Sequence, residues 1–121
     1  MPDTPELRQA AELVIKDWQA LGVAATLKIF ELGDFTQYVI RPRDYEAVLF
    51  GEILGRNLDL FSFWHSSQRL DPGLNIALYT NISVDKLLEN SRNLSDQELR
   101  TENYQKIEAE IMADHPAVFV Y

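Results

Sequence analysis

Apolar residues recur at helical spacing in the first part of the chain. Thr4 followed by Pro5 is typical of a helix start, because threonine caps the helix and proline suits its first position. Gly22 is placed to end the helix in a left-handed conformation. The pattern predicts an amphipathic helix, with Trp18 in the core, whose apolar face is formed by Leu7, Ala10, Ala11, Val14, Ile15, Trp18 and Leu21.

Two strands with a short helix between them are predicted to follow. VAATLKIF, residues 23–30, alternates between apolar and polar positions as strands do. FTQYVI, residues 35–40, favours a helix that stops near Arg41, because Pro42 disfavours helical geometry in the residue before it. DYEAVLFGEI, residues 44–53, has a continuously apolar centre, which is typical of a strand covered on both faces. This order predicts a parallel crossover unit.

The second half of the chain is predicted to be a loop-rich stretch followed by two helices and a strand. DLFSFWHSS, residues 59–67, favours a short helix. Ser83 is expected to cap one helix, and Ser95 with Glu98 forms a capping box for another that runs over residues 96–114. Residues 116–121 are expected to form a closing strand. No repeat or linker is visible, so residues 1–121 are predicted to form a single α/β domain.

Composition and charge narrow the functional classes. Nineteen acidic and eleven basic residues give a formal charge of -8, which argues against binding to nucleic acid or to anionic membranes. The absence of cysteine excludes disulfides, thiolate metal sites and a cysteine nucleophile. The start of this chain does not contain a secretory signal, and its apolar runs are too short to span a bilayer.

Motifs for catalysis and for cofactor binding are missing. His65 and His115 have no acidic or histidine partner at i+4, and His115 is expected to lie at a helix C-terminus. Ser66 and Ser67 lack the G-x-S-x-G context of a hydrolase nucleophile. The glycines do not form a phosphate-binding loop. The sequence therefore predicts no catalytic residues, no metal site and no cofactor.

The segment after the second predicted strand is the candidate ligand site. Ligands bind at the carboxyl ends of parallel strands, where Glu52, Arg56 and Asn57 offer charge and hydrogen bonds close to aromatic residues. A solvated loop over a partly buried aromatic cluster is an equally good interpretation of the same pattern. The predicted wall of the ligand cleft comprises Glu52, Ile53, Arg56 and Asn57, with Trp64 and His65 as further candidates.

The order of motifs resembles a known family. Tyr45, Glu46 and Gly51 match a motif in which tyrosine and aspartate introduce an apolar strand that ends in glycine, with Glu46 at the aspartate position. A later motif is matched by Asn75, Tyr79, Asn81 and Asp85. From about Glu6 to Tyr121, the chain resembles the C-terminal lobe of family 5 bacterial extracellular solute-binding proteins, the peptide and nickel class. The resemblance implies one lobe of a type II periplasmic-binding-protein fold, with a small, mostly parallel sheet flanked by helices.

The resemblance also implies a function. Such a lobe captures a solute or peptide together with the remaining lobe of a longer parent protein and delivers it to an ABC permease, outside the cytoplasm, without catalysis. Asn81 and Asp85 are expected to cap backbone groups and not to contact solute. Glu52 replaces the tryptophan that is common after the glycine in peptide-binding members, so the identity of the solute stays open.

Two alternatives remain beside this interpretation, and one expectation concerns the lobe in isolation. A similar region occurs as the solute-sensing domain of some cytoplasmic transcription regulators. An enzyme that uses Glu52 or a nearby aspartate would lose turnover on Glu52→Gln. An isolated lobe is also expected to expose apolar patches and strand edges, which favours a homodimer.

Overall fold

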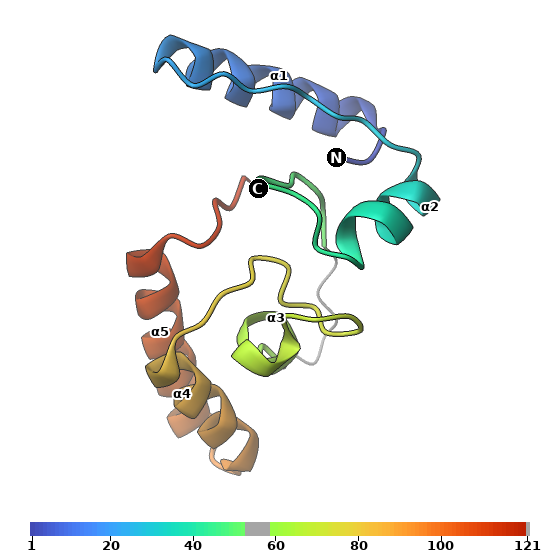
Figure 1. Ribbon diagram of the computed structural model, residues 1–121. Coiled ribbons are helices and arrows are strands. Elements are labelled where there is room, and N and C mark those ends of the chain that lie inside the picture. Colours follow the sequence, from blue (N-terminus) through green and yellow to red (C-terminus); the bar gives the residue numbers. More distant parts are fainter. Residues whose placement is uncertain (53–58, 121) are drawn as a thin grey trace. The chain divides into compact units, whose positions relative to one another are not determined.

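The computed structural model describes residues 1–52 and 59–120, which form helices joined by extended segments (Figure 1). The chain divides into two compact units, Met1–Leu54 and Gly55–Tyr121. Within the described residues, none of the helices combines the length and apolar character that crossing a bilayer requires. Each unit is considered by itself below, and the prediction of a single domain stays a prediction.

The first unit is built on the long helix α1, Pro5–Ala20. The side chain of Thr4 caps it by accepting a hydrogen bond from the N–H of Leu7, and Gly22 adopts φ 83 just after its end, as the sequence predicted. Leu7 and Ala11 are buried with Met1 against Leu27 and Leu49. The second half of the same apolar face stays open: Trp18 is 39% exposed, so the prediction that it lies in the core is wrong.

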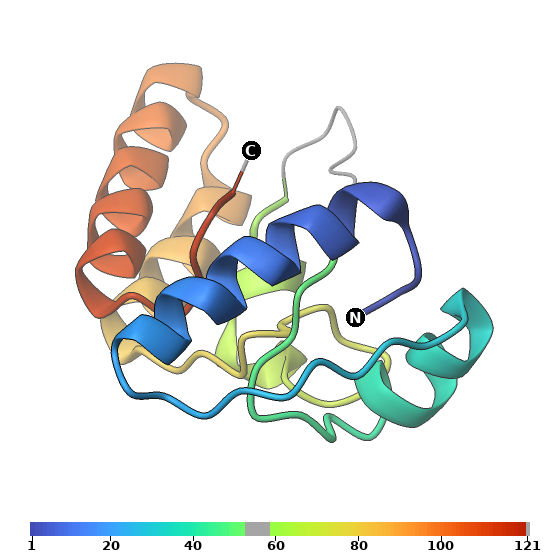
Figure 2. The same ribbon diagram turned by 90° about the horizontal axis from the view of Figure 1, so that it is seen from above.

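After α1 the chain runs back along the helix in extended form (Figure 2). Residues 23–30 make one isolated parallel bridge, between Pro2 and Phe30, and the described residues contain no other strand pairing. The predicted sheet is therefore not formed within residues 1–52 and 59–120. The bridge has α1 as its crossover, whereas the expected crossover through residues 35–40 joins no paired strands among the residues that the structure describes.

The helix expected over residues 35–40 begins earlier than predicted. It starts as α2, Leu32–Phe35, and continues as the π-helical turn η1, Thr36–Ile40, with Arg41 as C-cap. The end before Pro42 agrees with the prediction. Phe35 and Val39 are the buried residues of this segment, and Phe35 lies 6.4 Å from both Phe30 and Phe50 between ring centroids.

The second unit is an antiparallel helix pair with a short aromatic segment packed on it (Figures 1 and 2). Helix α3, Phe61–Trp64, and the 3-10 turn η2, Ser66–Gln68, confirm the short helix expected over residues 59–67. Helices α4, Ile82–Asn93, and α5, Gln97–Asp114, enclose an apolar core of Tyr79, Val84, Leu88, Ile107 and Ile111.

The N-caps of both helices in the second unit lie one or two residues from the serines predicted to cap them, and the expectation that Asn81 caps backbone groups is confirmed. Asn81, not Ser83, caps α4 and accepts hydrogen bonds from the N–H groups of Ser83 and Val84. Asp96, not Ser95, caps α5 and accepts from Glu98 and Leu99. Asparagine and aspartate cap helices as well as serine does, because their side-chain oxygens reach the same free N–H groups. The observed N-caps therefore lie two residues before Ser83 and one residue after Ser95. The expected strand over residues 116–121 is absent from its described part, 116–120.

Two chain reversals in this unit are tightly constrained. His115 ends α5 in the left-handed conformation, φ 52 and ψ 45, which confirms its expected place at the helix C-terminus. Gly73 packs so closely that a Cβ there would lie 2.1 Å from the carbonyl oxygen of Gln68.

Candidate functional site

The six residues predicted to contact ligand fall in different parts of the structure. Ile53, Arg56 and Asn57 lie outside the described residues. Glu52 is the last described residue before them and is exposed, yet partial desolvation raises the pKa of its carboxyl group. Trp64 and His65 belong to the second unit. The ligand-contact role of all six stays a prediction.

Trp64 lies at the edge of the apolar core of the second unit. Its ring meets that of Tyr79 edge-on, with centroids 6.0 Å apart and an interplanar angle of 84°. Phe119 approaches it at 6.1 Å. Edge-to-face contacts of this kind stabilise aromatic clusters. Trp64 is half-buried, so part of its ring packs against the core and part remains accessible.

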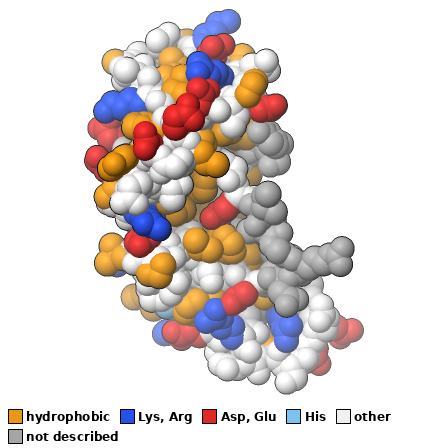
Figure 3. Space-filling view, turned by 90° about the vertical axis from the view of Figure 1, so that its right-hand side faces the viewer, with side chains coloured by type: hydrophobic (Ala, Val, Ile, Leu, Met, Phe, Trp, Pro, Cys, Tyr) orange, Lys and Arg blue, Asp and Glu red, His pale blue; other side chains and the backbone are white. Residues whose placement is uncertain are grey.

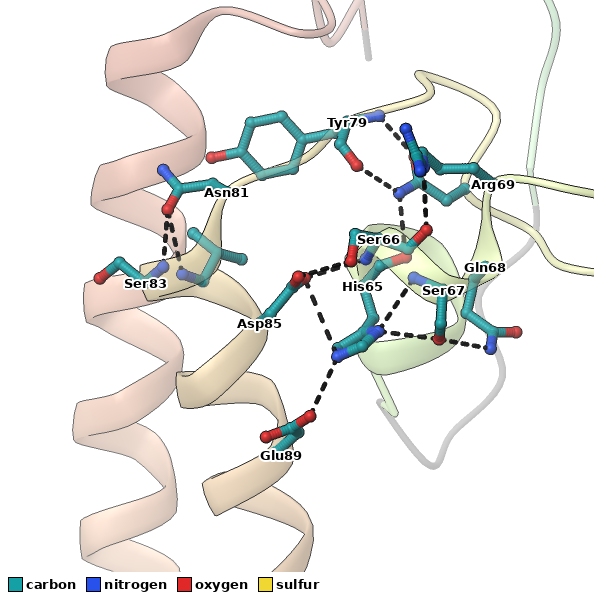
Figure 4. A network of polar contacts seen from close by, with 12 residues as sticks. His65, Ser66, Ser67, Gln68, Arg69, Tyr79, Asn81, Ser83, Asp85 and Glu89 are labelled. Carbon is teal, nitrogen blue, oxygen red and sulfur yellow. Dashed lines mark hydrogen bonds and ion pairs between the residues drawn. The ribbon is translucent and has the colours of Figure 1, made fainter.

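His65 is buried between the 3-10 turn and α4 (Figure 4). Its Nδ1 accepts the backbone N–H of Ser67 at 3.1 Å and lies 2.8 Å from the Ser67 hydroxyl oxygen. Because Nδ1 accepts, the neutral ring carries its proton on Nε2. Nε2 is buried without a hydrogen-bond partner in the described part of the chain, and it faces Glu89 Oε1 at 3.4 Å and Asp85 Oδ1 at 3.9 Å.

Asp85 holds the 3-10 turn against α4. Its carboxylate accepts the backbone N–H of Ser66 at 2.9 Å and the Ser66 hydroxyl at 2.6 Å (Figure 4). Hydrogen bonds to a charged carboxylate are among the stronger ones in proteins. Asp85 therefore caps backbone as the sequence predicted, although the capped backbone belongs to η2 and not to its own helix.

Asn75 closes the loop between η2 and α4 and is completely buried. Its amide group donates to the carbonyl oxygens of His65 and Tyr79, at 3.1 and 3.0 Å, and accepts the N–H of Tyr79 at 3.0 Å. One side chain thus satisfies three backbone groups that would otherwise be buried without partners. The role of Asn75 is to fix the loop.

Tyr79 and Asn81 fasten this loop to the end of α5. The Tyr79 hydroxyl donates to Asp114 Oδ2 at 2.6 Å, and the Asn81 amide donates to the same oxygen at 2.9 Å. These hydrogen bonds lower the pKa of Asp114. Burial, and then the hydrogen bond to the carboxylate, raise the pKa of Tyr79 to about 12. The four residues that carried the family resemblance in this region therefore hold the unit together.

Three side chains, Phe61, His65 and Arg92, form a stack beside helix α3. The rings of Phe61 and His65 are stacked with centroids 4.0 Å apart, and the Arg92 guanidinium lies 3.8 Å from the centroid of Phe61. Arg92 also binds both carboxylate oxygens of Asp59, which lowers the pKa of Asp59. The arrangement fixes Asp59, the first described residue after 53–58, to α4.

The chemistry of this network is structural. Apart from His65 Nε2, the donors and acceptors described above are bound to one another. Within residues 1–52 and 59–120 no three His, Cys, Asp or Glu side chains are placed to hold a metal ion. Sequence reasoning missed Asp114, Ser66 and the Asp59–Arg92 pair, which join residues 19 to 35 positions apart. No local pattern reports such contacts.

A shallow hollow lies in the first unit, at the C-terminal end of α1. It is lined by Gln19 and by Gly22, Val23, Ala24, Ala25 and Thr26. The lining carries no charged side chain, and sequence reasoning did not find it, because the hollow depends on the chain turning back along α1.

The sequence and the structure of this chain were compared with those of known proteins. No family model matches the chain. The oligopeptide-binding protein AppA of Bacillus subtilis is 29% identical over 112 residues, which are 92% of this chain and 20% of that protein. The di/tripeptide-binding protein 3 and the dipeptide-binding protein of Pseudomonas aeruginosa are each 27% identical over 107 residues, 87% of this chain and 20% of theirs.

A solved structure agrees with these sequence matches. The structure of the oligopeptide-binding protein AppA from Bacillus subtilis, in complex with a nonapeptide, superposes with a TM-score of 0.88 and 26% identity over 95% of this chain and 23% of that one. The chain is a homologue of oligopeptide- and dipeptide-binding proteins.

This homology to peptide-binding proteins confirms the resemblance inferred from Tyr45, Glu46, Gly51 and the residues that follow. The structural match also supports the expected type of fold, although the parallel sheet is not formed among the described residues. The chain spans about a fifth of the length of the curated relatives that it matches.

Proposed function

We propose that the chain is a ligand-binding lobe of an ABC importer substrate-binding protein, in which it supplies one wall of a cleft for a peptide. The observation that carries this proposal is the superposition on a protein solved with a nonapeptide, over 95% of this chain. Its relatives in both comparisons are binding proteins, which supports a role without catalysis and does not favour a transcription regulator.

The proposal includes the architecture of the lobe. Residues 1–121 form a C-terminal lobe with a small, mostly parallel sheet flanked by helices. The parallel bridge between Pro2 and Phe30 and the extended backbone after α1 support that sheet. The remaining lobe of the parent protein, an ABC permease and an extracytoplasmic location complete the proposed setting.

The proposed ligand wall is centred on Glu52 with Ile53, Arg56 and Asn57, and Trp64 and His65 are secondary candidates. Glu52 is exposed and lies within five positions of the other three, and its partly desolvated carboxylate offers a negative charge to a peptide amine. The secondary candidates are weaker because their contacts are used within the second unit.

A chimaera tests this proposal. This chain replaces the matching fifth of the Bacillus subtilis oligopeptide-binding protein, and calorimetry measures the affinity for a nonapeptide. We expect binding, and we expect Glu52→Gln to weaken it about tenfold or more, since a charged hydrogen bond is lost. Glu12→Gln, on the exposed face of α1, is the matched control and should leave binding unchanged.

Two results would count against the proposal. A chimaera that folds, judged by circular dichroism, and binds no peptide would contradict the peptide-binding role. Equal affinities for the Glu52→Gln and Glu12→Gln chimaeras would contradict the placement of the ligand wall. The chain alone is expected to show no measurable peptide affinity at micromolar concentration, because closure normally supplies the second wall.

A further inference from the structure

Helix α3 is a single turn whose position depends on side-chain contacts. A helix of four residues makes too few backbone hydrogen bonds to be stable alone, and the side chain of its N-cap residue, Leu60, makes no capping hydrogen bond. Phe61 and Trp64 pack against the apolar core of the second unit. Further contacts come from the neighbouring helix α4. The place of Trp64 therefore depends on how α4 holds this turn.

Arg92 of α4 holds the start of α3 in two ways at once. Its guanidinium donates to both carboxylate oxygens of Asp59, with Nε at 3.2 and 3.1 Å from them. The same group lies 3.8 Å from the ring centroid of Phe61. Asp59 Oδ1 in turn accepts the N–H of Phe61 at 3.2 Å. A planar guanidinium can combine a contact to two oxygens with stacking on a ring, and a lysine ammonium cannot.

The ring of Phe61 also joins Arg92 to His65. The rings of Phe61 and His65 are 17° from parallel, with centroids 4.0 Å apart. His65 points toward α4, where its Nε2 faces Glu89 Oε1 at 3.4 Å (Figure 4). Glu89 and Arg92 are three positions apart and therefore lie on one face of α4. Both partners of the Phe61 ring are thus held by the same face of one helix.

An ion pair at the surface would not by itself distinguish Arg92. Charged side chains of both signs lie close together at several places on the face drawn in Figure 3. The side chains of Arg92 and Asp59 are 46% and 47% exposed, and pairs as open as this one contribute little to stability. The distinguishing contact is the one to Phe61, which stands three positions before Trp64 and hence on the same side of α3.

We propose that Arg92 is a positioning residue for ligand binding, which fixes Asp59 and Phe61 so that α3 presents Trp64 to the ligand. The inference deepens the proposed function and rests on it, because Trp64 is one of the candidate ligand contacts. Arg92 itself is not a ligand contact. Trp64 suits the role because its ring packs edge-on against Tyr79 and stays partly accessible.

The chimaera with the Bacillus subtilis protein tests Arg92, and calorimetry measures its affinity for a nonapeptide. Arg92→Ala should weaken binding about fivefold, because the ion pair and the ring contact are both lost. Arg92→Lys keeps the charge but loses the planar contacts, and should weaken binding about threefold. Lys86→Ala removes a positive charge from an exposed position of the same helix and is the matched control, with unchanged affinity.

A double-mutant cycle separates positioning from general stabilisation. Trp64→Ala is expected to weaken binding, because a ligand contact is lost. Arg92→Ala should cause no further loss in that background, since it acts through Trp64. A purely stabilising residue would weaken binding by the same factor in both backgrounds. Asp59→Asn removes the carboxylate charge at similar size and should show the same coupling, and it replaces Arg92→Ala if circular dichroism shows that the Arg92→Ala chimaera is unfolded.

The results distinguish this inference from the proposed function. A folded chimaera with the unchanged chain that binds no peptide would contradict both. If that chimaera binds, equal affinities for Arg92→Ala and Lys86→Ala would overturn the role of Arg92 alone. Equal losses from Arg92→Ala with Trp64 and with Trp64→Ala would do the same. Full affinity of Arg92→Lys would show that charge suffices, which contradicts positioning through Phe61.

Discussion

The two units use apolar residues in different ways. In Gly55–Tyr121, α4 and α5 cover each other and α3 closes the core, so Val84, Leu88 and Ile107 are at most 1% exposed. In Met1–Leu54, α1 covers one extended segment, and Trp18, Leu21 and Val23 remain on the surface. An amphipathic pattern thus defines which face of a helix is apolar, and burial depends on whether another layer covers that face.

Truncating the core of the second unit should have the largest effect. Leu88→Ala removes a fully buried side chain and is expected to lower the free energy of unfolding by about 3 kcal/mol. Each unit contains one tryptophan, so urea unfolding of the second unit is followed by Trp64 fluorescence in a Trp18→Phe background. Val14→Ala, on the open face of α1, is the contrasting variant. Similar losses from both would contradict the difference in burial.

Removing the buried amide should come next. Asn75→Ala leaves the carbonyl groups of His65 and Tyr79 and the N–H of Tyr79 without their partner, and we expect a loss of about 2 kcal/mol by the same fluorescence measurement. Asn93→Ala, at the exposed end of α4, is the control. An Asn75→Ala protein as stable as that control would show that the loop is not fixed by this side chain.

The hydroxyl of Tyr79 should make the second unit sensitive to alkali. Its pKa is raised to about 12, above the ordinary value of 10.0, so the neutral form is favoured in the folded state. This contribution is complete below pH 10 and is lost as the pH rises toward 12. Tyr79→Phe should flatten the decline of stability over that range, and the exposed Tyr38→Phe should not. If Tyr79→Phe leaves the pH dependence of stability unchanged, the Tyr79–Asp114 contact is not the cause of the alkaline decline.

The cap of α1 should have the smallest effect. Thr4→Ala removes the side-chain acceptor for the N–H of Leu7 and is expected to cost about 1 kcal/mol. Trp18 fluorescence in a Trp64→Phe background reports the first unit. Thr4→Ser keeps the acceptor and is the matched control. A larger loss of stability for Thr4→Ala than for Leu88→Ala would contradict the difference between the two units, because a single exposed cap would then matter more than a fully buried core side chain.

Local signals in the sequence predicted the helices well and the sheet poorly. Thr4, Gly22 and Pro42 act through their nearest neighbours, so both ends of the first helix and the end of the second helical segment could be read directly. The caps of α4 and α5 were displaced by one or two residues because two possible capping residues stand within two positions of each other at each helix start. Strands need partners that lie elsewhere in the chain, and residues 23–30 show an alternating pattern with a single bridge.

The candidate site also has a part that could be predicted from the sequence and a part that could not. The motif of Asn75, Tyr79, Asn81 and Asp85 identified relatives correctly, and the expectation that Asn81 and Asp85 cap backbone groups is confirmed by their hydrogen bonds. Asn75 and Tyr79 also hold the second unit together. Their partners, such as Ser66 and Asp114, could not be predicted, because those contacts depend on how the helices pack. The ligand wall around Glu52 rests on the order of residues alone and stays a prediction.

The close approach at Gly73 has a consequence for variation in this chain. With a Cβ at 2.1 Å from the backbone of Gln68, every other amino acid would force two backbone segments apart. Gly33 and Gly51 have no atoms within 4 Å of the same added carbon. A library that randomises all three positions and is selected for folding should therefore retain glycine at 73 and accept most residues at 33 and 51.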